Sequence, residues 1–99
     1  MIYVCTLADL PRGAARRLPV EPPVSVFHTD AGDLYAIDDT CTHRGGPLSE
    51  GEVSGEEVTC PWHGAIYSIK TGAVLGPPAP RGVASYPVRL QGSDVEVEL

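Results

Sequence analysis

Four residues of the types that bind soft metals are grouped in two short segments of the chain. One residue separates Cys41 from His43, two separate Cys60 from His63, and sixteen lie between His43 and Cys60. Thiolates and imidazoles are ligands of zinc and of iron–sulfur clusters, so this set predicts a metal centre. The residue types alone leave both metals open.

The arrangement of the four candidate ligands favours an iron–sulfur cluster over zinc. Structural zinc sites usually pair two cysteines about 2–4 residues apart and two histidines about 3–5 apart, whereas here each segment supplies one Cys and one His. If both sulfurs bind one iron and both imidazoles the other, two facing loops clamp a flat cluster from opposite sides. Gly45, Gly46 and Gly64 let peptide N–H groups approach the sulfurs and stabilise the charge gained on reduction. A colourless zinc-stabilised interaction module is the alternative from another class.

Length and composition restrict the setting in which this centre works. Ninety-nine residues fit one domain with a small core, to which a metal centre adds stability. The N-terminus lacks the apolar stretch of about 7–15 residues of a secretory signal, and no apolar run approaches the roughly 20 residues that span a bilayer. We therefore expect a cytoplasmic protein that does not bind membranes. Thirteen acidic and seven basic residues give a formal charge of −6, which disfavours nucleic acid and favours basic partners.

The segments that must position the ligands read as an all-β domain. Gly and Pro are frequent, and the stretches between them are short and rich in Val, Ile, Tyr and Thr. Residues 2–5 predict a first strand, and Thr6 is expected to cap a single turn through Leu10. Hairpins are expected from four pairs of segments: 24–28 with 34–37, 53 with 57–59, 65–69 with 73–75, and 86–90 with 95–99. Because the hairpins alternate with the ligand segments, the ligands should lie in loops.

Several further residues have chemical potential but read as structural. Cys5 is expected to be a half-buried thiol in the first strand, since a free Cys packs as a small hydrophobe. His28 has no partner at ligand spacing and reads as a solvated or edge histidine rather than a third metal ligand. The basic group is interpreted as a solvated face; it consists of Arg12, Arg16 and Arg17.

Other residues near the ligands are candidates for partner contacts. Arg44 follows His43, and Trp62 stands between Cys60 and His63, where an exposed ring could form a docking contact. The alternative is that both side chains pack against their own loops. Acidic residues between the two ligand segments could steer a basic partner; they are Glu50, Glu52, Glu56 and Glu57.

The two ligand segments together resemble the Rieske family, whose motif is a Cys-x-His loop followed, after a hairpin, by a Cys-x-x-His loop. The resemblance implies one [2Fe-2S] cluster per chain, with Cys41 and Cys60 on one iron and His43 and His63 on the other. Residues 76–80, Gly-Pro-Pro-Ala-Pro, look like the proline loop that covers the cluster in that family. The implied fold is a single Rieske-type antiparallel β-sandwich over residues 1–99. Its small cluster-binding subdomain, at about 39–80, would contain two ligand loops and the proline loop.

Departures from the family pattern bear on function. Gly46 and Trp62 stand where Rieske proteins of respiratory complexes carry two cysteines joined in a disulfide, and Ala65 stands where those proteins carry a serine that bonds a bridging sulfide. Tyr67 matches the family's tyrosine that donates to a ligand sulfur. Losing the serine removes a donor to the electron-rich cluster, so we expect a potential at the low end of the Rieske span of about −150 to +300 mV.

With these departures the chain looks like the soluble Rieske-type ferredoxins of bacterial ring-hydroxylating oxygenase systems. The resemblance implies a monomeric one-electron carrier between an NAD(P)H-dependent flavin ferredoxin reductase and a terminal Rieske non-haem iron oxygenase. It also implies that the chain is not an enzyme, and the sequence offers neither a catalytic base near a plausible cleft nor a 2-His-1-carboxylate iron site. The alternative is the small Rieske-like subunit of an assimilatory nitrite reductase.

Overall fold

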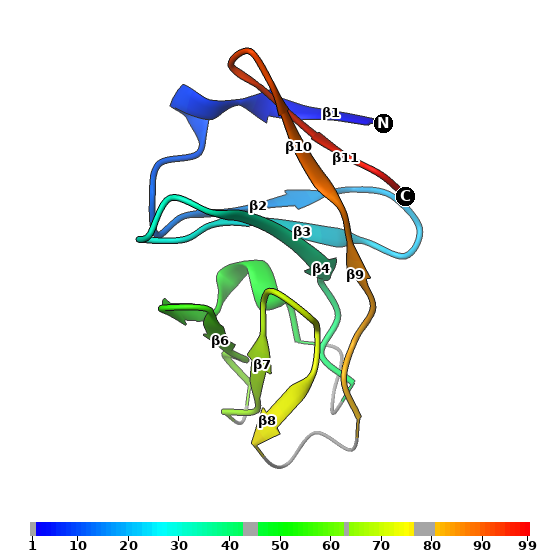
Figure 1. Cartoon of the computed structure of the whole chain (residues 1–99). Helices are drawn as coiled ribbons and strands as arrows, with labels where there is room; N and C mark the ends of the chain where they lie inside the picture. The colour runs from blue at the N-terminus through cyan, green and yellow to red at the C-terminus, as the bar shows by residue number, and fades with distance from the viewer. Residues whose placement is uncertain (1, 43–45, 63, 77–80) are drawn as a thin grey trace.

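Three antiparallel sheets stack in the computed structural model, which describes residues 2–42, 46–62, 64–76 and 81–99 (Figure 1). The first sheet has the order β1–β11–β10 and is formed by β1 (Ile2–Thr6), β10 (Val88–Gln91) and β11 (Asp94–Val97). The second has the order β2–β3–β4–β9 and is formed by β2 (Ala15–Leu18), β3 (Val24–His28), β4 (Leu34–Asp38) and β9 (Ser85–Tyr86). The third runs β5–β6–β7–β8 and is formed by β5 (Glu52–Ser54), β6 (Glu57–Thr59), β7 (Ile66–Ser68) and β8 (Val74–Gly76).

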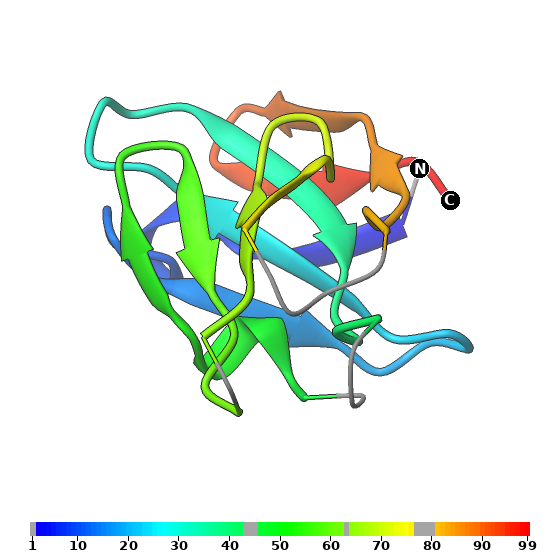
Figure 2. The same ribbon diagram turned by 90° about the horizontal axis from the view of Figure 1, so that it is seen from below.

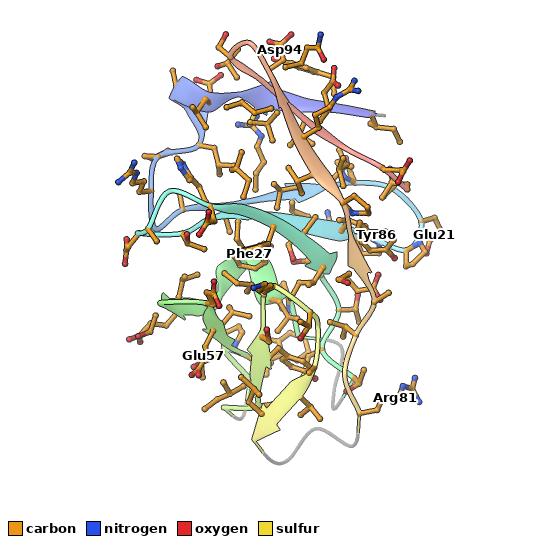
Figure 3. The ribbon with its side chains drawn as sticks, viewed as in Figure 1. Glu21, Phe27, Glu57, Arg81, Tyr86 and Asp94 are labelled. Carbon is orange, nitrogen blue, oxygen red and sulfur yellow. The ribbon has the colours of Figure 1, made fainter. Side chains whose placement is uncertain are left out.

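The second sheet is the middle layer, because strand β3 is buried over its whole length. Val24 and Val26 pack with Val95 and Val97 of β11 in one hydrophobic core. Phe27 belongs to a second core on the opposite face, and Figure 3 shows it between the middle sheet and the third sheet. Since alternate residues of a strand point to opposite faces, burial at every position of β3 places this strand between the two cores.

The third sheet lies at the end of the molecule away from the two chain termini (Figure 1). It packs on the second core through residues that include Val58, Tyr67 and Ile69. The short 3₁₀ helix η2 (Leu48–Glu50) precedes it and contributes Leu48 to the same core. Seen from below, the β5–β6 and β7–β8 turns lie at the same end of the third sheet (Figure 2).

The observed elements confirm the predicted all-β fold class and its four hairpins. The sequence pattern did not predict β2, whose two central residues, Arg16 and Arg17, are exposed. The expected turn after the first strand is the 3₁₀ helix η1 (Leu7–Asp9), but the Thr6 side chain does not cap its backbone. Instead, Thr6 Oγ1 donates to Asp9 Oδ2 at 3.1 Å. Within the described residues, no helix is long and apolar enough to span a membrane.

Candidate metal centre

The two segments that carry the candidate ligands are loops closed in the same way. In the first ligand loop (41–46), the Cys41 N–H donates to the Gly46 carbonyl at 2.9 Å. In the second ligand loop (60–65), the Cys60 N–H donates to the Ala65 carbonyl at 2.7 Å. The residues that flank each loop pair with each other, as Thr40 with Pro47 and Thr59 with Ile66. Each cysteine therefore stands at the first position of a loop of six residues between two antiparallel segments.

The buried carboxylate of Asp39 anchors the first ligand loop to the middle sheet. Asp39 Oδ1 accepts the Ser49 N–H at 2.7 Å, and its Oδ2 accepts Arg17 Nε at 3.2 Å. The Asp39 carbonyl accepts the Leu48 N–H. These contacts tie β2 and η2 to the backbone two residues before Cys41, so the position of the loop is set from both of its ends.

The buried thiols of Cys41 and Cys60 are neighbours in one core. Cys41 and Cys60 are 1% and 3% exposed, and the Cys41 thiol lies close enough to raise the pKa of the Cys60 thiol. Burial raises the pKa of the Cys60 thiol, a hydrogen bond from the Trp62 backbone N–H lowers it, and the neighbouring Cys41 raises it. Two adjacent buried sulfurs, one of them facing a peptide N–H, suit a pair of thiolates bound to a single metal ion.

Tyr67 of β7 lies against the Cys41 sulfur. Its hydroxyl oxygen is 3.2 Å from Cys41 Sγ, accepts the Thr42 N–H at 3.0 Å, and lies 2.9 Å from Thr42 Oγ1. The Thr42 hydroxyl donates to the Arg81 carbonyl at 2.7 Å. Burial is the main cause that raises the pKa of Tyr67, which keeps the hydroxyl protonated and available as a donor. This geometry agrees with the sulfur donor expected at Tyr67.

Gly46 makes room for the sulfur of the other loop. A Cβ atom at this position would lie 2.8 Å from Cys60 Sγ and 3.1 Å from Cγ and Cδ2 of Trp62. The first distance is shorter than real Cβ contacts and the second is unusually tight, so a side chain here would displace the Cys60 sulfur or the Trp62 ring. The two loops thus approach each other closely at Gly46 and Cys60. Together with the two thiols and the Tyr67 hydroxyl, this arrangement fits a metal cluster held between the loops.

The structure describes only part of the predicted ligand set. Cys41 and Cys60 are brought together, whereas His43 and His63 lie outside the described residues. Arg44 and Gly45 also lie outside them, as does most of the proposed proline loop (77–80). Gly64, expected to allow close backbone approach, has a φ of +79°, a value that favours glycine.

Three predictions for individual residues were wrong in part. His28 is buried rather than solvated or at an edge, and its Nδ1 donates to the Leu10 carbonyl at 2.7 Å, because β3 is a central strand. Cys5 is fully buried rather than half-buried, because it packs between the first and middle sheets. Arg17 is more than a solvated residue, since it pairs with the buried Asp39.

The sequence also missed residues that shape the site. Asp39 and Thr42 carried no signal as isolated residues, although a carboxylate just before a Cys-x-His segment is consistent with an anchor for the loop. Trp62 is 49% exposed, as a docking residue would be, yet its ring contacts Gly46 of the other loop. Neither alternative given for Trp62, a docking contact or packing against its own loop, included this contact with the first loop.

Comparison with known proteins agrees with this site. Residues 1–87 match the Rieske [2Fe-2S] domain. The chain is 39% identical to the 3-phenylpropionate/cinnamic acid dioxygenase ferredoxin subunit of Shigella boydii over 99% of this chain and 92% of that protein. A complex of reduced oxygenase and oxidised ferredoxin in carbazole 1,9a-dioxygenase contains a similar chain, with a TM-score of 0.90, 31% identity, and 97% and 90% of the two chains covered. A ferredoxin of Sphingomonas yanoikuyae B1 has a TM-score of 0.90, 28% identity, and 99% and 97% coverage. This chain belongs to the Rieske [2Fe-2S] domain family.

Proposed function

We propose that the chain is a one-electron carrier of an oxygenase system and holds a Rieske [2Fe-2S] cluster through Cys41, His43, Cys60 and His63. In this arrangement the two thiolates bind one iron and the two imidazoles bind the other. The meeting of the Cys41 and Cys60 thiols, from two loops closed in the same way, supports the proposal most directly. Residues 1–99 would form one domain, with residues 39–80 as its cluster-binding part.

The surrounding groups are suited to electron transfer. A [2Fe-2S] cluster supplies reversible transfer of one electron, with a potential set by hydrogen bonds to its sulfurs and by solvent exposure. The Trp62 N–H and the Tyr67 hydroxyl face the Cys60 and Cys41 sulfurs, respectively. Donors bond a sulfur more strongly when it carries more negative charge, so both groups favour the reduced state. A protein that only carries electrons in this way needs no catalytic side chain that acts on a substrate.

The names of the similar proteins support the choice of partners. One relative is a dioxygenase ferredoxin subunit, and a similar chain occurs in a complex with its oxygenase. By the same chemistry, this chain would donate electrons to a terminal Rieske non-haem iron oxygenase and accept them from an NAD(P)H-dependent flavin reductase. We also propose that it works as a cytoplasmic monomer, since a mobile carrier must dock in turn with two partners through the same exposed end.

Substitution of each proposed ligand tests this function. Cys41→Ser, Cys60→Ser, His43→Ala and His63→Ala should each abolish the two-iron, two-sulfide content and the visible absorption of the cluster. Cys5→Ala is the matched control, because Cys5 is equally buried but lies in β1, and it should retain the full content. A full iron and sulfide content in any one of the four ligand variants would remove that residue from the proposed set.

A further inference from the structure

The only tryptophan of the chain belongs to the second ligand loop but contacts the first. Cγ and Cδ2 of Trp62 lie so near Gly46 that a Cβ atom there would be 3.1 Å from each. The indole ring therefore lies beside Gly46 on the side where a side chain would project, next to the Cys60 sulfur that a Cβ at Gly46 would approach to 2.8 Å. The ring and the sulfur of the second loop thus occupy the space that a side chain at position 46 would need.

The position of Trp62 differs from that of an ordinary core residue. Its side chain is 49% exposed and belongs to neither hydrophobic core of the described residues, whereas Gly46 and Cys60 beside it are buried. Its backbone N–H also faces the Cys60 sulfur, where it lowers the pKa of that thiol. One residue thus faces the ligand sulfur with its backbone and covers the other loop with its ring. Such contacts affect the junction of the two loops far more than the stability of the sheets.

The chain has no covalent means of joining the two loops if its ligands are those proposed. Its three cysteines are Cys41 and Cys60, which are then occupied by iron, and Cys5, which lies in β1. Any attraction that keeps the loops closed must be non-covalent. Aromatic surface packed on a glycine backbone provides it, because a large rigid ring gains contact area at little cost in conformational entropy.

We propose that Trp62 is a positioning residue for the cluster: its indole clamps the second ligand loop onto Gly46 of the first and keeps water from the Cys60 sulfur. The inference rests on the proposed ligand set and deepens it. In this proposal the exposed Trp62 ring helps the protein to retain its cluster, whether or not the ring also contacts a partner. Loss of the ring would open the junction and speed loss of iron, while the sheets stay folded.

Release of iron to a chelator from the holoprotein tests the clamp. Trp62→Ala should release iron about 10-fold faster than the natural chain, the lower range for loss of a group that supports metal ligands. Trp62→Phe keeps an aromatic ring over Gly46 and should restore slow release. Leu75→Ala is the matched control, because Leu75 of β8 is a similarly exposed apolar side chain, at 53%, and its rate should be unchanged.

A second variant approaches the same contact from the other side. Gly46→Ala places a methyl group against the Trp62 ring and Cys60 Sγ. Like Trp62→Ala, this variant should release iron faster than the natural chain. Both variants should also alter the electron paramagnetic resonance signal of the reduced protein. Far-UV circular dichroism should report the same folded sheets in all variants. Equal release rates for Trp62→Ala and the natural chain would overturn the clamp while leaving the ligand set intact. A natural chain that binds no cluster would overturn both.

Discussion

The Tyr67 hydroxyl lies 3.2 Å from the Cys41 sulfur although 26 positions separate the two residues along the chain. Both side chains belong to the core between the middle and third sheets, which shields this contact from water. If Cys41 binds the cluster as proposed, a hydroxyl fixed beside its thiolate stabilises the extra electron on the cluster. The contact connects the packing of the third sheet with the potential at which the protein works.

Removing this hydroxyl should lower the reduction potential. If the hydrogen bond is about 1 kcal/mol stronger in the reduced state, Tyr67→Phe should lower the potential by ~40 mV. The measurement is a spectroelectrochemical titration of both proteins. Tyr35→Phe is the control, because the Tyr35 hydroxyl donates to Glu56 instead, and its potential should match that of the natural chain. An unchanged potential in Tyr67→Phe would show that the hydroxyl does not act on the sulfur.

Loss of the Asp39 carboxylate should destabilise the fold. Asp39→Ala leaves the Ser49 N–H without its acceptor and should lower the free energy of unfolding by about 2 kcal/mol. Arg17→Ala should cost less than about 1 kcal/mol, because the Arg17 side chain is 53% exposed and water screens its ion pair. Asp39→Asn keeps an acceptor and should lie between them. Denaturant unfolding followed by circular dichroism gives the three values, and the reverse order for Asp39→Ala and Arg17→Ala would contradict this account.

Stability should fall in alkali through Tyr86. Its hydroxyl donates to Asp38 Oδ1 at 2.6 Å, and this hydrogen bond, with burial, raises the pKa of Tyr86 from 10 to about 12. Between these values the folded chain keeps a proton that the unfolded chain has lost. The contribution of this group is therefore complete below pH 10 and is lost as the pH rises toward about 12.

Thermal unfolding across this alkaline range checks the prediction. The natural chain should lose stability more steeply than Tyr86→Phe, which has no proton to lose at this position. Ultraviolet titration should show one fewer late-ionising tyrosine in the variant. Parallel losses of stability in the two proteins would mean that Tyr86 does not carry this effect.

The acidic residues around the β5–β6 hairpin should speed encounter with a basic partner. Glu52 and Glu57 are exposed there, and Figure 3 shows Glu57 on the side of the molecule opposite Glu21. The second-order rate of electron transfer should fall as salt rises, and Glu52→Gln with Glu57→Gln should reduce both the rate and its salt dependence. Glu21→Gln is the control, because it also removes one negative charge from an exposed glutamate but lies away from this hairpin, and it should leave the rate nearly unchanged. A rate indifferent to ionic strength would exclude steering.

The sequence predicted the parts of this protein that depend on local pattern. Alternation and turn residues predicted the strand pairs from β3 to β8, and Cys41 and Cys60 were singled out by their spacing from histidines. Local pattern could not predict contacts made between layers. Arg17 read as solvated because its partner, Asp39, stands 22 residues away, and His28 read as exposed because nothing local marks β3 as a central strand.

The contact of Trp62 with Gly46 shows the same limit within the site. From the sequence, Trp62 is explained as a docking residue and Gly46 as a position that lets the backbone approach closely. Only the arrangement of the two loops brings these residues together. The network from Arg81 through Thr42 to Tyr67 likewise joins three separate segments. The local pattern therefore identified the candidate ligands, whereas the groups proposed to tune and retain the cluster could be recognised only from the fold.

A redox titration of the protein followed by electron paramagnetic resonance tests the central claim most directly. Two imidazoles and two thiolates with few sulfur donors predict a rhombic signal that appears on one-electron reduction with a midpoint near the low end of the Rieske range, about −150 mV. A midpoint near about −400 mV, the value of all-cysteine plant-type clusters, would contradict histidine ligation. The absence of any signal, with stoichiometric zinc in the protein, would contradict electron transfer itself.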